Sequence, residues 1–241
     1  MSVWAVLVAA GRGERLGDDR PKAFVRLGDL PLLAEPLRRL DASDWIDSIV
    51  VVAPPEWEEP AILCAEEIGA SKVASCVTGG ETRVESVRAG VAEVPEDAAV
   101  VLVHDAARPI LPPEVVPRLL EALGEGWDGA VPGVPLADTV KRVRDGAVVE
   151  TLARDELWAV QTPQAFVTPV LREALSLSLS LSLPLPGPDN ASDKLSQGTN
   201  GATDCSSLVE ARGGRVTVVP GDERLLKVTT RADLERVAQW L

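Results

Sequence analysis

Short apolar runs alternate along the chain with segments long enough to form helices. Five of these runs are rich in valine: Val3–Ala9, Ser48–Ala53, Lys72–Val77, Ala99–Asp105 and Gly129–Val134. Because apolar residues follow one another instead of alternating with polar ones, each run is typical of a strand covered on both faces. The pattern therefore predicts a mostly parallel sheet.

The segments between these runs carry apolar residues at helical spacing. In Thr82–Val94, valines recur every three or four residues and would form one buried face. A second helix is expected after Pro113, with Pro117 in or near its first turn, where the missing N–H costs little. Helices that connect strands in this way cover both faces of the sheet. We expect an α/β protein with three layers: helix, sheet and helix.

The last helix is expected to begin at Thr230. Thr230 and Asp233 have the spacing of a capping box, in which each side chain satisfies a backbone N–H of the other residue. The residues expected on the buried face of this helix are Leu234, Val237, Ala238 and Leu241.

The segment 138–158 departs from the alternation of strands and helices. Asp145 and Gly146 lie between two strand-like runs, which is a strong signal for a hairpin with a type I′ turn. Polar residues occupy alternate positions, so one face of the hairpin is either solvated or covered by a partner.

A second unusual segment spans residues 177–201. Leucine and serine alternate at its start, and Pro, Gly, Ser and Asn follow. The alternation fits a strand, but such a strand would be an uncharged edge liable to aggregate. We therefore interpret the segment as a poorly packed, low-complexity insertion without a catalytic role.

Length and charge limit the possible partners. The 241 residues suffice for one large α/β domain with an appendage, and we expect a single domain over residues 1–241. The 24 basic and 37 acidic residues give a formal net charge of −13, which argues against general attraction to nucleic acid or an anionic membrane. An anionic ligand would need a local site.

The start of the chain and its cysteines bear on location. The first apolar run follows Met1 and Ser2 directly, without a basic leader, and no apolar run reaches the roughly 18 residues of a membrane span. Cys64, Cys76 and Cys205 are odd in number and form no CxxC pair, as expected of reduced, buried thiols. We expect a cytoplasmic protein.

A glycine-rich stretch, AAGRGERLGDDRPKAF (Ala9–Phe24), follows the first predicted strand. It lacks the GxxxxGK[ST] of a P-loop, and its glycines are spaced GxGxxxG instead of the GxGxxG of a dinucleotide site. Backbone amides and cations remain, and we expect Arg15 and Lys22 to converge on phosphate groups. The alternative is that its arginines are only solvated.

Two further motifs follow predicted strands. GGETRVESVRAGV (Gly79–Val91) places two glycines, Arg83 and Ser86 at a helix start, where free N–H groups favour anions. HDAARP begins with His104 and Asp105, which point to opposite faces of their strand. Asp105 is a candidate ligand for a ribose hydroxyl or Mg²⁺. We interpret His104 as a structural hydrogen-bonding residue, not a catalytic one.

Read together, the motifs resemble a known enzyme family. The ordered set AAGRGERL, PK, GGETRVESV, HDAARP, DT, RxxLWxxQTPQ, ATD and KVTT is similar to 2-C-methyl-D-erythritol 4-phosphate cytidylyltransferases. The resemblance covers nearly the whole chain apart from residues 177–201. It implies a Rossmann-like nucleotidyltransferase fold and transfer of CMP from CTP to methylerythritol 4-phosphate, with release of pyrophosphate, in non-mevalonate isoprenoid biosynthesis.

The resemblance also implies roles for individual residues. Those implied to bind cytidine and ribose are Ala9, Ala10, Gly11, Gly80, Ser86, Asp105 and Ala106. Those implied to surround the α-phosphate are Arg15, Lys22 and Lys227, assisted by Mg²⁺ at Asp105. Those implied to hold methylerythritol phosphate are Arg108, Thr139, Arg154 and Thr162. Thr139 and Arg154 would reach the site from the hairpin of a second subunit, which implies a homodimer with residues 138–158 as its arm.

Three positions depart from the usual residues of the family. Ala23 replaces a glutamine, Cys205 a second aspartate and Leu225 an asparagine, which removes hydrogen-bonding support near Lys22 and Lys227. Three other functions stay open: a cytidylyltransferase for another polyol phosphate such as ribitol 5-phosphate, a non-catalytic nucleotide-binding module, and a dinucleotide-dependent oxidoreductase.

Overall fold

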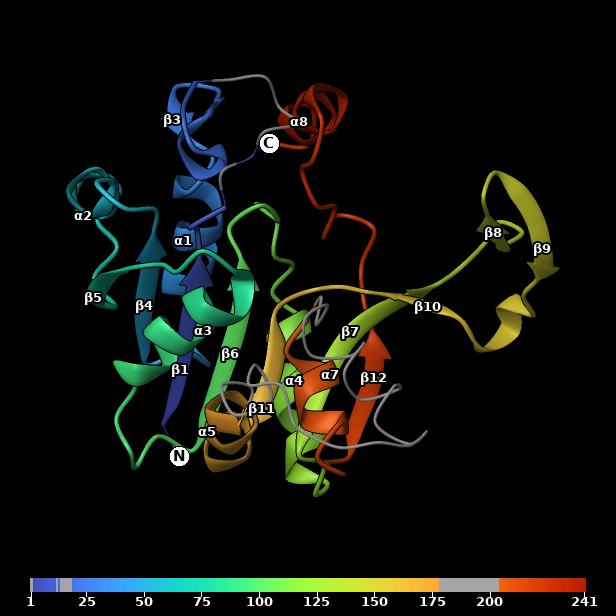
Figure 1. Cartoon of the computed structure of the whole chain (residues 1–241). Helices are drawn as coiled ribbons and strands as arrows, with labels where there is room; N and C mark the ends of the chain where they lie inside the picture. The colour runs from blue at the N-terminus through green and yellow to red at the C-terminus, as the bar shows by residue number, and fades with distance from the viewer. Residues whose placement is uncertain (1, 12, 14–18, 178–203) are drawn as a thin grey trace, which may run out of the picture.

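The structure, a computed structural model, describes residues 2–11, 13, 19–177 and 204–241. Within these residues, eight strands form one central sheet with helices on both faces (Figure 1). The strands are β1 (Val3–Val8), β4 (Ser48–Ala53), β5 (Val73–Thr78), β6 (Val100–Asp105), β7 (Gly129–Pro135), β10 (Trp158–Val160), β11 (Gln164–Val167) and β12 (Val216–Pro220). They lie in the order β10, β7, β11, β6, β1, β4, β5, and β12 also pairs with β7.

The expected strands are all present, and each end lies within one residue of its predicted position. Strands β5, β4, β1 and β6 run parallel to one another, and β12 runs parallel to β7. The short strands β10 and β11 are antiparallel to their neighbours. Strands β10, β11 and β12 were not predicted. The mostly parallel sheet is thus confirmed.

Alternation along each buried strand builds two hydrophobic layers. In β1, Ala5 and Leu7 face one layer and Val6 faces the other. Helices α1 (Ala34–Asp41), α2 (Glu58–Glu67) and α4 (Val115–Gly124) cover the first face, and α3 (Arg83–Ala92), α5 (Thr168–Leu177) and α7 (Ser206–Glu210) cover the second. The predicted three-layer α/β architecture is confirmed.

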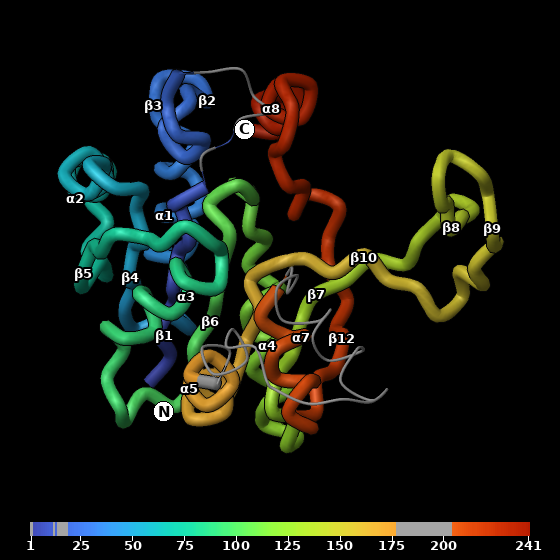
Figure 2. The backbone as a smooth tube through the Cα atoms, viewed as in Figure 1, coloured from blue at the N-terminus to red at the C-terminus, as the bar shows by residue number. Residues whose placement is uncertain are grey.

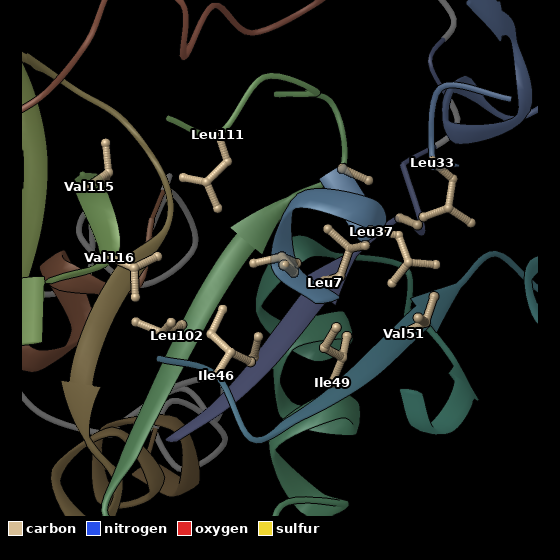
Figure 3. Close-up of a cluster of buried hydrophobic side chains, with 14 of the residues drawn as sticks. Leu7, Leu33, Leu37, Ile46, Ile49, Val51, Leu102, Leu111, Val115 and Val116 are labelled. Atoms are coloured by element: carbon tan, nitrogen blue, oxygen red, sulfur yellow. The ribbon is translucent and has the colours of Figure 1, made fainter. Parts of the chain in front are cut away.

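Figure 3 shows part of the first layer. Leu37 of α1 lies near Leu7 of β1, and Val116 of α4 lies near Leu102 of β6. These side chains are fully buried. Burying apolar surface contributes about 25 cal/mol per Å², so this layer supplies much of the force that holds the carboxyl ends of the strands in place.

The helices expected from the sequence form with small differences. Thr82 caps α3 through a reciprocal hydrogen-bond pair with Glu85, and Pro117 is the third residue of α4. The predicted capping box between Thr230 and Asp233 is confirmed at the start of α8 (Arg231–Ala238).

The predicted buried face of α8 is only half right. Leu234 and Val237 are buried, but Ala238 and Leu241 are exposed. Helix α8 does not cover the main core: it packs on a small separate cluster that includes Leu27 of the two-residue strand β2 (Arg26–Leu27). Strand β2 pairs with β3 (Leu30–Pro31). Leu234 and Val237 are the two residues of α8 that belong to this cluster.

The predicted hairpin is present as β8 (Lys141–Arg144) and β9 (Ala147–Thr151). Asp145 and Gly146 have φ values of 50° and 80°, and positive φ at both central residues is what a type I′ turn requires. The hairpin extends away from the sheet beyond β7, as Figures 1 and 2 show, and every residue of its two strands is exposed.

The leucine–serine run begins in a helix. Leu175 and Leu177 belong to α5, and Leu175 is buried against the second layer, so the strand template is wrong for the start of this run. The rest of the low-complexity insertion lies outside the described residues. All three cysteines are free thiols: Cys64 and Cys205 are buried as predicted, and Cys76 is half-buried. Among the described helices, none combines the length and apolarity that crossing a bilayer would require.

Candidate active site

A pocket of about 470 Å³ opens at the carboxyl ends of β1, β4, β5 and β6. This is the edge at which open α/β sheets bind ligands. Backbone hydrogen bonds continue past the strand ends, from Ala9 N–H to the Val52 carbonyl and from Ala106 N–H to the Val8 carbonyl. The loops that form the pocket wall are therefore fixed to the sheet.

Most of the predicted site residues meet in this pocket. The lining includes Ala9, Ala10, Gly11, Lys22, Gly80, Ser86, Asp105, Ala106 and Lys227. Their individual roles stay predictions. Arg15 lies outside the described residues.

Glycines give the pocket its room on the α3 side. A Cβ at Gly79 would meet the side chain of Ala10, and one at Gly80 would meet that of Glu85. Ser86 holds this turn in place: its hydroxyl accepts from Gly80 N–H at 3.1 Å and donates to the Thr82 carbonyl at 3.0 Å. The turn presents little but backbone to a ligand.

Lys22 and Lys227 come together from distant parts of the chain. Lys22 belongs to the short helix η2 (Lys22–Phe24), and its Nζ donates to the carbonyl of Val228, the neighbour of Lys227, at 3.0 Å. Val228 N–H in turn donates to the Ala107 carbonyl at 2.8 Å. The segment that carries Lys227 is thereby fastened to the end of β6.

Asp105 is the charged centre of the pocket. Its Oδ2 pairs with Lys227 Nζ at 2.7 Å, and its Oδ1 pairs with Arg83 Nε and Nη2, each at 3.0 Å. Burial raises the pKa of Asp105, but the two cations lower it by more, so its pKa lies well below the ordinary value. With Lys22, the described lining carries three cations against Asp105 and Glu81, which is a local excess of positive charge in an acidic protein.

Arg83 was noted in its motif at a helix start, but the resemblance implied no individual role for it. It is the first residue of α3, three positions after Gly80, and it lines the pocket. Its position in that motif was visible, but the ion pair with a residue 22 positions away was not.

Three residues without an assigned role support Arg83 from behind. Arg83 Nη1 donates to the Cys205 thiol at 3.4 Å, and Cys205 N–H donates to Gln164 Oε1 at 3.1 Å. Gln164 Nε2 donates to Asp204 at 2.9 Å. Gln164, Asp204 and Cys205 therefore form a hydrogen-bonded group behind Arg83.

His104 is fully buried and both of its ring nitrogens are engaged. Nε2 contacts the Arg108 carbonyl at 3.0 Å, so it carries the proton, and Nδ1 accepts from the Thr162 hydroxyl at 3.0 Å. The Thr162 oxygen accepts from Asp105 N–H at 3.0 Å. Burial lowers the pKa of His104 to about 4. His104 is thus a buried hydrogen-bonding residue, as expected, and its non-catalytic role stays a prediction.

The four predicted acceptor residues do not line this pocket. Thr162 gives its hydroxyl hydrogen to His104, and Arg108 donates to the carbonyls of Leu225 at 2.5 Å and Val160 at 3.4 Å. Thr139 and Arg154 are exposed on the arm, where Arg154 donates to the Ala137 carbonyl. A second chain would have to supply the last two, and that stays a prediction.

Comparison with known proteins identifies the family. The model of the 2-C-methyl-D-erythritol 4-phosphate cytidylyltransferase family matches residues 3–241. The chain belongs to this family. The cytidylyltransferase of Frankia casuarinae is 43% identical over 233 residues, which cover 96% of this chain and 78% of that protein. The cytidylyltransferase of Nocardia farcinica is 40% identical over 241 residues, which cover 100% of this chain and 94% of that protein.

A solved structure supports the same assignment. The cytidylyltransferase from Francisella tularensis is 28% identical and covers 100% of both chains with a TM-score of 0.79. Membership in the cytidylyltransferase family favours an enzyme over the alternative of a non-catalytic binding module. It also excludes the alternative of a dinucleotide-dependent oxidoreductase.

The departures from the family pattern are all buried. Ala23 fills the core with its methyl group while its carbonyl accepts from Leu33 N–H at 2.8 Å. Leu225 is buried and its carbonyl holds Arg108. Cys205 places a neutral thiol against Arg83, and burial raises the pKa of that thiol. Asp105 is accordingly the charged partner of Arg83 in the described structure.

Proposed function

We propose that the enzyme transfers CMP from CTP to 2-C-methyl-D-erythritol 4-phosphate and releases pyrophosphate. The observation that carries this proposal is the meeting of Lys22, Lys227 and Arg83 around one pocket at the carboxyl end of a parallel sheet. An ion pair at ~4 Å contributes ~4 kcal/mol at an effective dielectric of 20, so cations that converge on a triphosphate would make a large contribution to its binding.

The nucleoside would occupy the glycine side of the pocket. Gly80 and Ser86 present backbone and a fixed hydroxyl, and Ala106 leaves space beside Asp105. We assign the cytidine and ribose to this side, together with Ala9, Ala10 and Gly11. The phosphates then extend toward Lys22 and Lys227, with Arg15 from the glycine-rich loop.

The reaction needs no general base. A phosphate oxygen of the acceptor attacks the α-phosphorus of CTP, forming one P–O bond, while the bond to the β-phosphate oxygen breaks and pyrophosphate leaves. The acceptor oxygen is already largely ionised near neutral pH, because the second pKa of a phosphomonoester is about 6. The side chains that act are cations, which position the phosphates and stabilise the charge of the transition state.

A magnesium ion fits the donor set of the pocket. Mg²⁺ is ordinarily held by one or two carboxylates together with substrate phosphates. Asp105 supplies a carboxylate at the pocket wall, and no group of three or more potential ligand side chains exists among the described residues, so the ion would arrive with the triphosphate. Bound there, Mg²⁺ would neutralise part of the phosphate charge.

The arm would complete the acceptor site of a second subunit in a homodimer. Thr139 and Arg154 lie on the arm, outside the pocket of their own chain, while Arg108 lies between β6 and Leu225. Arg154 from a partner would then hold the acceptor phosphate near Arg108, with Thr139 and Thr162 nearby. We place this dimer in the cytoplasm, where CTP is available.

The test is a turnover assay with CTP, Mg²⁺ and either methylerythritol 4-phosphate or ribitol 5-phosphate. We expect pyrophosphate release with the first acceptor and little with the second. Turnover of ribitol 5-phosphate alone would overturn the choice of acceptor, and no turnover with either would overturn the reaction.

The phosphate role of Lys227 is tested by Lys227→Ala. Removing one such contact costs about 10²- to 10³-fold in kcat when it acts in the transition state. Arg26→Ala is the matched control, because Arg26 is an exposed cation outside the pocket that holds only the Asp29 carbonyl. Similar turnover in the Lys227 and Arg26 variants would contradict the assignment.

A further inference from the structure

Lys22 is followed two residues later by a buried aromatic ring. Phe24 ends the helix η2 and packs on Trp57 with ring centroids 4.6 Å apart and an interplanar angle of 43°. Pairs in this range contribute about 0.5–1.5 kcal/mol beyond the burial of their area. Since η2 has one turn, fixing Phe24 fixes the backbone from which the Lys22 side chain starts.

The turn that carries Trp57 is also part of the pocket. Trp57 N–H donates to the Pro54 carbonyl at 3.0 Å, and Pro54 and Pro55 line the pocket beside Lys22. Within this turn Glu56 has a φ of 68°, a left-handed conformation that disfavours residues with a Cβ. Strained backbone of this kind persists where surrounding contacts hold it, and it is concentrated at functional sites.

The opposite side of Lys22 is confined as well. Gly13 has a φ of 70°, and a Cβ there would lie 2.5 Å from Lys22 Cβ, so the backbone of Gly13 lies directly against the stem of the lysine. At the tip, Nζ donates to Val228. The neighbouring Ala23 offers only a methyl group, so its side chain can support Lys22 by packing but not by a hydrogen bond.

We infer that Trp57 is a positioning residue for Lys22: through the Phe24 ring it fixes η2, and thereby the direction from which the lysine ammonium meets the phosphates. The inference rests on the proposed role of Lys22 at the α-phosphate. Trp57 does not line the pocket, so its effect on turnover passes through Lys22 and not through contact with substrate.

The first test compares Trp57→Leu with Trp127→Leu. Both tryptophans are half-buried and pack against the same core layer, but Trp127 lies under Arg215, away from the pocket. We expect Trp57→Leu to lower kcat about 10- to 100-fold, because a shift of about 1 Å in a catalytic group has an effect of this size. Trp127→Leu should keep the wild-type kcat at a similar loss of melting temperature, and equal kcat losses in both variants would overturn the inference.

Two further measurements distinguish a positioning role of Trp57 from a general packing role: the kcat of a conservative variant, and the separate effects on kcat and KM. Trp57→Phe keeps a ring for Phe24 and should restore most of kcat. The KM for the acceptor should change little in Trp57→Leu. Trp57→Met carries the same expectation and serves if Trp57→Leu does not fold, because the unbranched methionine side chain adapts to irregular gaps in a core. A Phe variant as slow as the Leu variant would contradict a role for the ring pair.

The decisive experiment is a double-mutant cycle with Lys22→Ala. If Trp57 acts through Lys22, Trp57→Leu should cause no further loss of kcat once the lysine is absent, because residues that act as a unit are strongly non-additive. Additive losses would overturn the inference while leaving Lys22 in its role. Wild-type kcat in Lys22→Ala would instead overturn the proposed role of Lys22 itself, so the two failures are distinguishable.

Discussion

Burial decides the protonation state of His104, the only histidine of the chain. Its ring lies one residue from Asp105, but the two side chains belong to opposite faces of β6, and the imidazole is enclosed by Thr162 and the Arg108 carbonyl. The attraction of Asp105 favours the charged ring, and the loss of solvent outweighs it. His104 therefore stays neutral and fixes the backbone on which Asp105 and Arg108 are mounted.

This environment predicts a titration near pH 4. The pKa of His104 is lowered from 6.5 to about 4, so the unfolded chain binds a proton that the folded chain does not. The contribution of His104 to the free energy of unfolding is complete above pH 6.5. It falls by about 3 kcal/mol in total as the pH drops toward 4, because the unfolded chain is then protonated and the folded chain is not. Because there is a single histidine, its ring C–H signals in NMR report the midpoint directly. A midpoint close to 6.5 would contradict the burial of the ring.

At the residue scale, the sequence predicted which residues belong to the site, but it did not predict which of them contact one another. The order of Lys22, Asp105 and Lys227 in their motifs was enough to predict that they meet. The contacts of Arg83 with Asp105 and Cys205 join residues 22 and 122 positions apart, and no local pattern encodes such pairs. The same holds for Phe24 and Trp57, whose rings come from the end of η2 and from the residue before α2.

Close approach of α3 to the sheet is the feature that matters most at the scale of elements. Gly90 lies on the buried face of α3, and a Cβ there would meet Val6 and lie 2.7 Å from Val52 Cγ2. The helix therefore sits directly on β1 and β4, which brings its first turn, with Arg83 and Ser86, to the ends of these strands.

The same substitution should have opposite effects in two helices. Gly90→Ala should lower the free energy of unfolding by about 1–3 kcal/mol, since overpacking outweighs the better helix propensity of alanine. Gly124→Ala, at the end of α4 with open space around it, should raise it by about 0.5 kcal/mol. Urea denaturation measures both, and stabilisation by Gly90→Ala would show that α3 does not lie so close to the sheet.

Elements were predictable where the hydrophobic period was long and clear. Buried parallel strands and the amphipathic helices α3 and α4 have such patterns, and Asp145–Gly146 specifies its own turn. Strands β10 and β11 have three and four residues, too few to define a period, and their antiparallel pairing depends on β7 and β6. The predicted buried face of α8 was too long, because Ala238 and Leu241 are exposed. The helix packs on a small cluster, and hydrophobic periodicity does not predict the size of the surface that a helix covers.

The arm and its surroundings define the molecule as a whole. Exposed apolar side chains gather there: Val143, Val148, Val149, Trp158, Val160 and Val218. Val143 and Val148 are cross-strand partners in the hairpin, so they form one apolar patch. Exposed apolar patches are common at contact surfaces, and in the proposed dimer a second copy of the chain would cover this one.

Charge on this patch should separate the dimer. We expect Val143→Glu combined with Val148→Glu to sediment as a monomer and to lose turnover, because Arg154 and Thr139 would no longer reach a partner. Leu63→Glu, at an equally exposed apolar position on α2, should leave both the sedimentation and the turnover of the protein unchanged. A monomeric arm variant with full turnover would contradict substrate contacts between subunits.

The absence of a buried residue in β8 and β9 has a further consequence for the enzyme in dilute solution. A hairpin without a core of its own is marginally stable in water, so its order would come from the partner it covers. Association follows mass action, which ties the fraction of complete sites to the total amount of protein. The rate per milligram should therefore fall as the enzyme is diluted below the dissociation constant of its dimer, and recover when it is concentrated again.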